Sequence, residues 1–158
     1  MSATRPKAED GPKLELAVQR AASAAGLPTR AELHRWLKAA LEQSAAITVR
    51  FVGVAEGRRL NRTYRGRDYA TNVLSFGYDA RDATLAGDIV LCVPVLTREA
   101  RAQGKPLAAH IAHLTVHGAL HLQGYDHPNR RAAARMETRE KRILALLGFP
   151  DPYAGDAG

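Results

Sequence analysis

Cysteine is almost missing from this sequence, with Cys92 as the single thiol among 158 residues. One thiol excludes an intramolecular disulfide, and no disulfide-linked partner is expected. Cys92 lies within an apolar run, so it is interpreted as a small buried residue in a reducing compartment.

Long apolar segments are also missing. Nowhere do about 18 apolar residues follow one another, which excludes a membrane-spanning helix and a membrane partner. The first twelve residues lack an apolar block of signal-peptide length. We therefore expect a cytoplasmic protein, long enough for one domain with a core and too short for two. Residues 1–12 are predicted to be a disordered tail, 13–150 the domain and 151–158 a C-terminal tail.

Acidic residues are outnumbered by basic ones, 16 against 23, and the formal net charge is +7. A positive balance suits a polyanionic partner. Several arginines crowd around Tyr64, and the guanidinium fork fits two phosphate oxygens while an aromatic ring can stack on a base. This segment predicts an RNA-binding groove, with a solvated basic helix end as the alternative. The candidate RNA contacts are Arg59, Arg62 and Arg67.

Three histidines between residues 117 and 127 have the spacing of metal ligands. His117 and His121 stand four apart, which places both side chains on one face of a helix. Gly124 allows the chain to leave that helix, and His127 follows before a proline that favours extended backbone. Three neutral imidazoles leave one zinc position open for water, as in catalytic sites. The segment predicts one zinc ion per chain, bound by His117, His121 and His127.

The same spacing occurs in metzincin peptidases, which carry a glutamate directly after the first histidine as general base. Here that position is Gly118, so a zinc peptidase lacks its base. Two further histidines precede the motif on the same helical stripe. We interpret His113 as a packing residue or a partner of a ligand, and His110 as a structural polar group.

Hydrophobic periodicity predicts strands and helices in an order typical of an α+β domain. Strands are predicted at residues 14–19, 47–51, 73–78 and 87–93, and helices at 29–43, 55–65, 94–103, 107–122 and 129–147. The run at 87–93 is apolar on both faces, which favours a central strand. In the second helix, Leu60 and Tyr64 are expected on the inner side. The metal-binding helix is expected to lie against a small mixed sheet.

Short motifs along the chain carry a family resemblance. They are Leu60-Asn61, Tyr64-Arg65-Gly66-Arg67-Asp68, Thr71-Asn72-Val73-Leu74-Ser75-Phe76, Gly87-Asp88-Ile89, the histidine segment, and the ending Leu147-Gly148-Phe149 with Asp151-Pro152-Tyr153. Over roughly residues 14–153 the chain resembles the YbeY family of bacterial rRNA-maturation endoribonucleases. Two departures are visible, because Asn72 stands where many members have Asp, and Gly77 stands where Pro is frequent.

The resemblance implies a zinc-dependent, single-strand-specific endoribonuclease that matures the 3′ end of 16S rRNA and supports ribosome quality control. It implies single-stranded rRNA and the small ribosomal subunit with its proteins as partners. It also implies zinc ligation by His117, His121 and His127 and a catalytic role for Arg65. Asp126 is a candidate proton acceptor or partner of a ligand. Two alternatives stay open, a zinc metallopeptidase-like hydrolase and a non-catalytic ribosome assembly factor.

Overall fold

The computed structural model describes residues 11–81 and 84–154, and the predicted N-terminal tail lies almost wholly outside them. The strands are β1 (Leu14–Arg20), β2 (Ala45–Val52), β3 (Val73–Arg81) and β4 (Thr84–Cys92). The helices are α1 (Arg30–Ala40), α2 (Val54–Arg65), α3 (Val93–Ala102), α4 (Leu107–Leu122) and α5 (Arg130–Leu146). The predicted α+β fold is confirmed.

The four strands form one mixed sheet in the order β1-β2-β4-β3. β1 and β4 both run parallel to β2, and β3 pairs antiparallel with β4. The apolar run at the end of β4 lies inside the sheet, as predicted, because an inner strand buries both of its faces. β3 is an edge strand.

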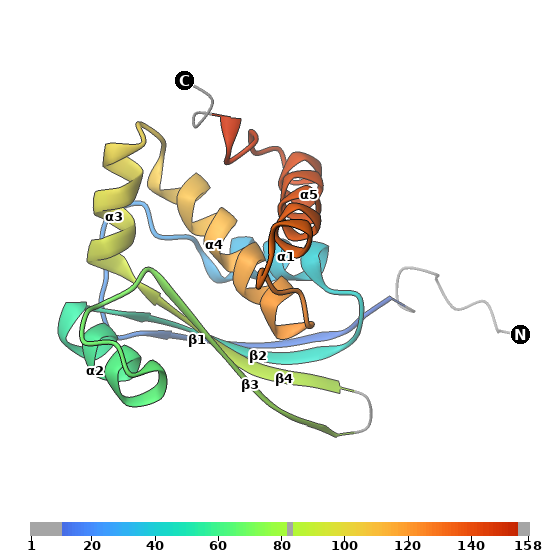
Figure 1. The fold of residues 1–158 in the computed structure, drawn as a ribbon, viewed down its shortest axis with the longest axis horizontal. Helices are drawn as coiled ribbons and strands as arrows, with labels where there is room; N and C mark the ends of the chain where they lie inside the picture. Colours follow the sequence, from blue (N-terminus) through green and yellow to red (C-terminus); the bar gives the residue numbers. More distant parts are fainter. Residues whose placement is uncertain (1–10, 82–83, 155–158) are drawn as a thin grey trace, which may run out of the picture.

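The helices cover the sheet unequally. Figure 1 shows α4 above the sheet with α1 and α5 beside it, and α2 on the opposite side. Fully buried side chains from the sheet and from α1, α4 and α5 form the main core, among them Trp36, Phe51, Ile89, Leu120 and Ile143. The predicted packing of α4 against the sheet is therefore confirmed.

Two glycines allow α4 to approach the strands closely. A Cβ atom on Gly118 would lie 3.1 Å from Ile89 Cγ2 and 3.1 Å from Ser75 Oγ. A Cβ atom on Gly87 would lie 2.7 Å from Leu122 Cδ2, nearer than real Cβ atoms come to a neighbour. The C-terminal half of α4, which carries His117 and His121, is thus seated directly on β3 and β4.

The predicted inner side of α2 is confirmed for Leu60, which packs against buried side chains of the sheet, and is wrong for Tyr64. The structure buries Gly57 and Asn61, whereas Tyr64 is 62% exposed. Gly57 lets the helix approach β4, because a Cβ there would lie 3.2 Å from Cys92 Sγ. Asn61 is polar but finds a partner, since its Nδ2 donates to Tyr69 O over 2.7 Å. The buried residues of α2 are thus a small one and a polar one, whereas Tyr64 contacts the sheet only at its edge, through the ring of Phe76.

Candidate metal centre and nucleic-acid surface

The end of α4 brings the three predicted zinc ligands into one region. His117 and His121 lie on the last turns of the helix, and Gly124 follows with φ +100°, the left-handed conformation that glycine permits. The chain then turns back, so that the rings of His117 and His127 lie with centroids 5.9 Å apart. Gln123 anchors the turn, because its Nε2 donates to Ala40 O and to Ala119 O.

Each of the three imidazoles uses its Nδ1 atom for a hydrogen bond. His117 Nδ1 lies 2.5 Å from Glu140 Oε2, His121 Nδ1 lies 3.2 Å from Tyr125 O, and His127 Nδ1 lies 3.3 Å from Asp126 Oδ1. A carbonyl or carboxylate partner requires the tautomer with its proton on Nδ1, which leaves a lone pair on Nε2. Metal-binding histidines are commonly held by such partners.

This donor set fits a zinc ion in its chemistry. No Nε2 atom of the three histidines has a hydrogen-bond partner within the residues that the structure describes. Desolvation, and next the charge of His117, lower the pKa of His121, which favours the neutral ligand form. In the described part of the chain, no three His, Cys, Asp or Glu side chains converge as they would around an ion. Ligation therefore stays a prediction.

Sequence reasoning missed Glu140. This residue of α5 is fully buried, and its carboxylate accepts hydrogen bonds from His117 Nδ1, His113 Nε2 and Tyr153 Oη. Burial by itself raises the pKa of Glu140, but the three hydrogen bonds outweigh it and lower the pKa to about 2. The sequence contains one signal that could have identified Glu140 as buried. It lies on the apolar stripe of α5, four residues after Met136 and three before Ile143.

Residues 151–154 of the predicted C-terminal tail return to the domain. Tyr153 Oη donates to Glu140 and also lies 3.3 Å from His113 Nε2. Burial and the hydrogen bond to Glu140 raise the pKa of Tyr153, so the phenol stays protonated. Asp151 accepts from the Tyr153 backbone N–H and pairs with Lys141. The C-terminal segment thus supplies one of the donors that hold the carboxylate beside His117.

His110 and His113 take the structural roles expected for them. His110 is 3% exposed, and its Nε2 lies 2.8 Å from Glu99 Oε1. Desolvation chiefly lowers the pKa of His110, which favours the neutral ring.

Asn72 Nδ2 also donates to Glu99. An aspartate at 72 would instead place two carboxylates together, so the departure at this position suits the local partner.

Arg65 is the last residue of α2, and the edge strand β3 holds its side chain. Its Nη2 donates to Ser75 O over 2.8 Å, and its guanidinium carbon lies 5.5 Å from the centre of the Phe76 ring. The positive charge of Arg65 is among the smaller causes that lower the pKa of His121. The edge strand β3 therefore fixes Arg65 at a place from which its charge is felt at His121.

The predicted RNA contacts lie along the same helix and the loop after it. Arg59, Arg62 and Arg67 are all exposed. Arg62 Nη1 lies 3.7 Å from Asp68 Oδ1, and Arg58 binds both oxygens of that carboxylate. Part of the basic charge is thus neutralised within the chain, whereas Arg59 and Arg67 have no ion pair in the described residues.

Comparisons with known proteins agree with this architecture. The model of the family described as Endoribonuclease YbeY matches residues 19–148. The chain belongs to the YbeY family. This membership confirms the sequence-based prediction of an endoribonuclease.

Relatives named Endoribonuclease YbeY match most of the chain. One from Aromatoleum aromaticum is 62% identical over 145 residues, covering 90% of this chain and 94% of the relative. One from Thiobacillus denitrificans is 57% identical over 143 residues, covering 90% and 97%. The solution structure of TM1509 from Thermotoga maritima has a TM-score of 0.51 at 18% identity, and covers 84% of this chain and 91% of that one. This last likeness shows a shared fold.

Membership of the YbeY family also bears on the peptidase alternative. The position that holds the general base of metzincins is Gly118, which faces Ile89 and Ser75 at the helix–sheet contact. A glutamate could not fit there without moving α4 off the sheet. The family and the packing at Gly118 therefore both count against a peptidase.

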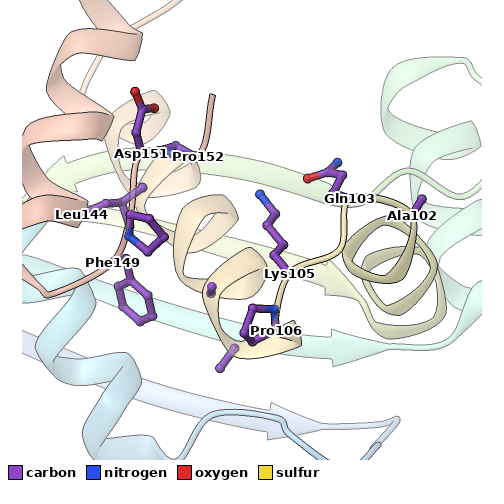
Figure 2. A pocket seen from close by; sticks show the side chains of 11 residues that line it. Ala102, Gln103, Lys105, Pro106, Leu144, Phe149, Asp151 and Pro152 are labelled. Atoms are coloured by element: carbon purple, nitrogen blue, oxygen red, sulfur yellow. The ribbon is translucent and has the colours of Figure 1, made fainter. Parts of the chain in front are cut away.

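One cavity of this YbeY-family protein lies away from the three predicted zinc ligands. It has a volume of about 670 Å³ and is lined by the loop before α4, the first turns of α4 and the C-terminal segment. Figure 2 shows Lys105, Pro106 and Phe149 on its walls. None of the predicted zinc ligands or arginines lines it.

No described helix is long and apolar enough to cross a membrane.

Proposed function

We propose that this protein is a zinc-dependent endoribonuclease specific for single-stranded RNA. We further propose that it matures the 3′ end of 16S rRNA and supports ribosome quality control in the cytoplasm, together with small-subunit proteins. The observation that carries the proposal is the set of three histidines with engaged Nδ1 atoms and unpartnered Nε2 atoms beside Arg65. The exposed arginines of α2 add the charge that a polyanion requires.

His117, His121 and His127 would hold one zinc ion through their Nε2 atoms. A zinc ion bound there supplies Lewis-acid polarisation of a phosphoryl oxygen. Glu140 keeps the proton of His117 on Nδ1 and fixes the orientation of that ring. Tyr125 O and Asp126 do the same for His121 and His127.

Arg65 has the chemistry to stabilise the charge that develops on the reacting phosphate. Its guanidinium carries a positive charge and is positioned by Ser75 O and the Phe76 ring, so little reorganisation is required. Asp126 is a candidate proton acceptor. Its pKa is lowered first by the hydrogen bond from the His127 backbone N–H, so it is a carboxylate at neutral pH. The nucleophile is either water or the 2′-hydroxyl of the RNA.

The test compares zinc-loaded and chelated protein on single-stranded and duplex RNA, with the new ends mapped on a 16S rRNA precursor. We expect the zinc-loaded protein to cleave single-stranded RNA but not duplex RNA. The chelated protein should cleave neither. Alanine at His117, His121 or His127 should lower the zinc content, whereas His110→Ala should keep it near one ion per chain.

Two results would favour the alternatives. RNA that is bound by the zinc-loaded protein but never cleaved would indicate a non-catalytic assembly factor. Cleavage of peptides without cleavage of RNA would indicate a peptidase. Full zinc occupancy in all three histidine variants would overturn the ligand assignment.

A further inference from the structure

A groove of about 480 Å³ lies between α2 and the sheet, on the face opposite to α4. It is lined by side chains from α2, β2, β3 and β4, and a volume of this size falls in the range of small-molecule sites. Its lining includes Tyr64, Arg65, Phe76, Tyr78 and Asp88.

Aromatic rings form the walls of the groove. Tyr64 is 62% exposed and Tyr78 is 57% exposed, and they are two of the few large apolar side chains that the described residues leave in solvent. Tyr64 meets Phe76 edge to face, with ring centroids 5.1 Å apart. Single exposed aromatics are ordinary, but a cluster around a groove marks a binding surface.

The charges in and around the groove differ in sign. Inside it, Asp88 Oδ2 accepts a hydrogen bond from Tyr78 Oη over 2.6 Å, which orients the ring and, as the first cause, raises the pKa of Tyr78 to about 12. Glu56 is also inside, paired with Arg50 at 2.7 Å. Two guanidinium groups also line it, those of Arg50 and Arg65, whereas the other exposed arginines of α2 and of the loop that follows lie outside it. A phosphate is repelled by an interior carboxylate, whereas the amino group of a base can donate to it.

The groove adjoins the predicted metal centre across one strand. Ser75 of β3 accepts the hydrogen bond from Arg65 through its carbonyl oxygen. The Ser75 hydroxyl faces the opposite side of the sheet, toward α4. There it lies 3.1 Å from the position of a Cβ atom built on Gly118, the residue that follows His117. A nucleotide chain that passes over the edge strand can therefore reach both sides.

We propose that the groove between Tyr64 and Tyr78 binds one unstacked base of the single-stranded RNA, next to the phosphate that Arg65 contacts. Base and aromatic ring stack without strong sequence preference, because every base has a π face. Asp88 accepts from an amino group on the edge of that base. A base held in a duplex is stacked and paired, so it cannot enter, which is a physical basis for single-strand specificity. This inference rests on the proposed function.

The experiment measures the affinity of chelated protein for a labelled single-stranded RNA oligonucleotide, and for the same chain with abasic residues. Chelation prevents cleavage during the measurement. Tyr64→Ala and Tyr78→Ala should each weaken binding of the intact RNA about tenfold, as expected for the loss of one stacking contact. Binding of the abasic RNA should change less than twofold. Tyr69→Ala is the matched control, because Tyr69 is 51% exposed but does not line the groove.

Four outcomes would contradict the proposed base-binding groove. Equal losses on intact and abasic RNA would show that the tyrosines do not contact a base. An effect of Tyr69→Ala as large as that of Tyr64→Ala would assign the change to the surface in general. If wild-type protein cleaves RNA but binds intact and abasic chains equally, the groove is overturned while the nuclease proposal stands. Protein that neither binds nor cleaves RNA when loaded with zinc would overturn both.

Discussion

The protonation site on each imidazole decides whether a histidine can bind a metal ion. Hydrogen bonds from Nδ1 to Glu140, Tyr125 O and Asp126 leave the Nε2 lone pairs of the three histidines without a hydrogen-bond partner in the described residues. Glu140 is the most buried of these partners, and it is supported in turn by His113 and Tyr153. The carboxylate therefore links the C-terminal segment to the predicted metal centre.

Replacing Glu140 tests this link. Glu140→Gln keeps the volume of the side chain but removes the charge that holds the Nδ1 proton of His117. Loss of such a partner typically lowers metal affinity about 10- to 100-fold. Zinc affinity can be measured by competition with a chromogenic chelator. Glu137→Gln, on the same helix and without a contact to His117, is the control and should leave the affinity unchanged.

Variants at Arg65 are expected to lose cleavage activity without losing zinc. Arg65→Ala should lower the single-turnover rate of RNA cleavage about 10²- to 10³-fold, because one preorganised donor to the reacting phosphate is lost. Zinc content should not change. Arg65→Lys should restore only part of the rate, since lysine keeps the charge but lacks the planar fork. A wild-type rate in Arg65→Ala, or loss of its zinc, would contradict this role.

Among the elements, α4 and the β3–β4 pair hold the site together. The helix is seated on the sheet through Gly118, and its last residue, Leu122, packs over Gly87. His117 and His121 are positioned by this contact, because they lie in the same two turns of α4. Any change that lifts the end of the helix from the sheet also moves the two ligands.

Two glycines that pair across β3 and β4 allow this contact to be tested. Gly87→Ala should destabilise the protein by roughly 1–3 kcal/mol, since a methyl group there would overlap Leu122 and the Phe76 carbonyl oxygen. Gly77→Ala is the control, because a Cβ atom there would lie 3.8 Å from Leu122 Cδ2, an ordinary van der Waals distance. Urea denaturation measures both free energies of unfolding. Equal midpoints for the two variants would show that α4 does not need the space at Gly87.

For the molecule as a whole, positive charge is gathered on the side of α2 and the edge strand. Arg65 belongs to this charge and is felt at His121 of the predicted metal centre, and Asp68 neutralises part of the charge by pairing with Arg58 and Arg62. The exposed arginines at the start of α5 form a second basic group that does not line the groove between α2 and the sheet, although Arg135 lines a smaller hollow with Asp126 and Pro128. The two groups should therefore contribute differently to RNA binding.

The salt dependence of RNA affinity distinguishes the two basic groups. The logarithm of affinity should fall with the logarithm of salt concentration, with a slope of about −0.7 for each phosphate contact on single-stranded RNA. The double substitution of Arg59 and Arg67 by alanine should make this slope smaller. The triple substitution of Arg130, Arg131 and Arg135 should leave it nearly unchanged. A flat salt response of the wild-type protein would remove phosphate contacts from the explanation of binding.

The sequence was sufficient for the features that depend on neighbours along the chain. Alternation of apolar residues predicted β1 and β2, because side chains of a strand alternate between faces. The four-residue spacing of His117 and His121 and the glycine at 124 predicted two side chains on one helix face and a turn after it, and both are present. These are local rules of backbone geometry.

Only the tertiary structure decided which distant residues meet. Glu140 reaches His117 from 23 positions away, and Tyr153 reaches His113 from 40 positions away, so no local spacing could pair them. Tyr64 was expected inside because of its spacing from Leu60, but the contact surface of α2 was set by the backbone space at Gly57 and the hydrogen bond of Asn61. Packing and buried hydrogen bonds depend on the shape of the partner, and that shape exists only after the sheet and helices have assembled.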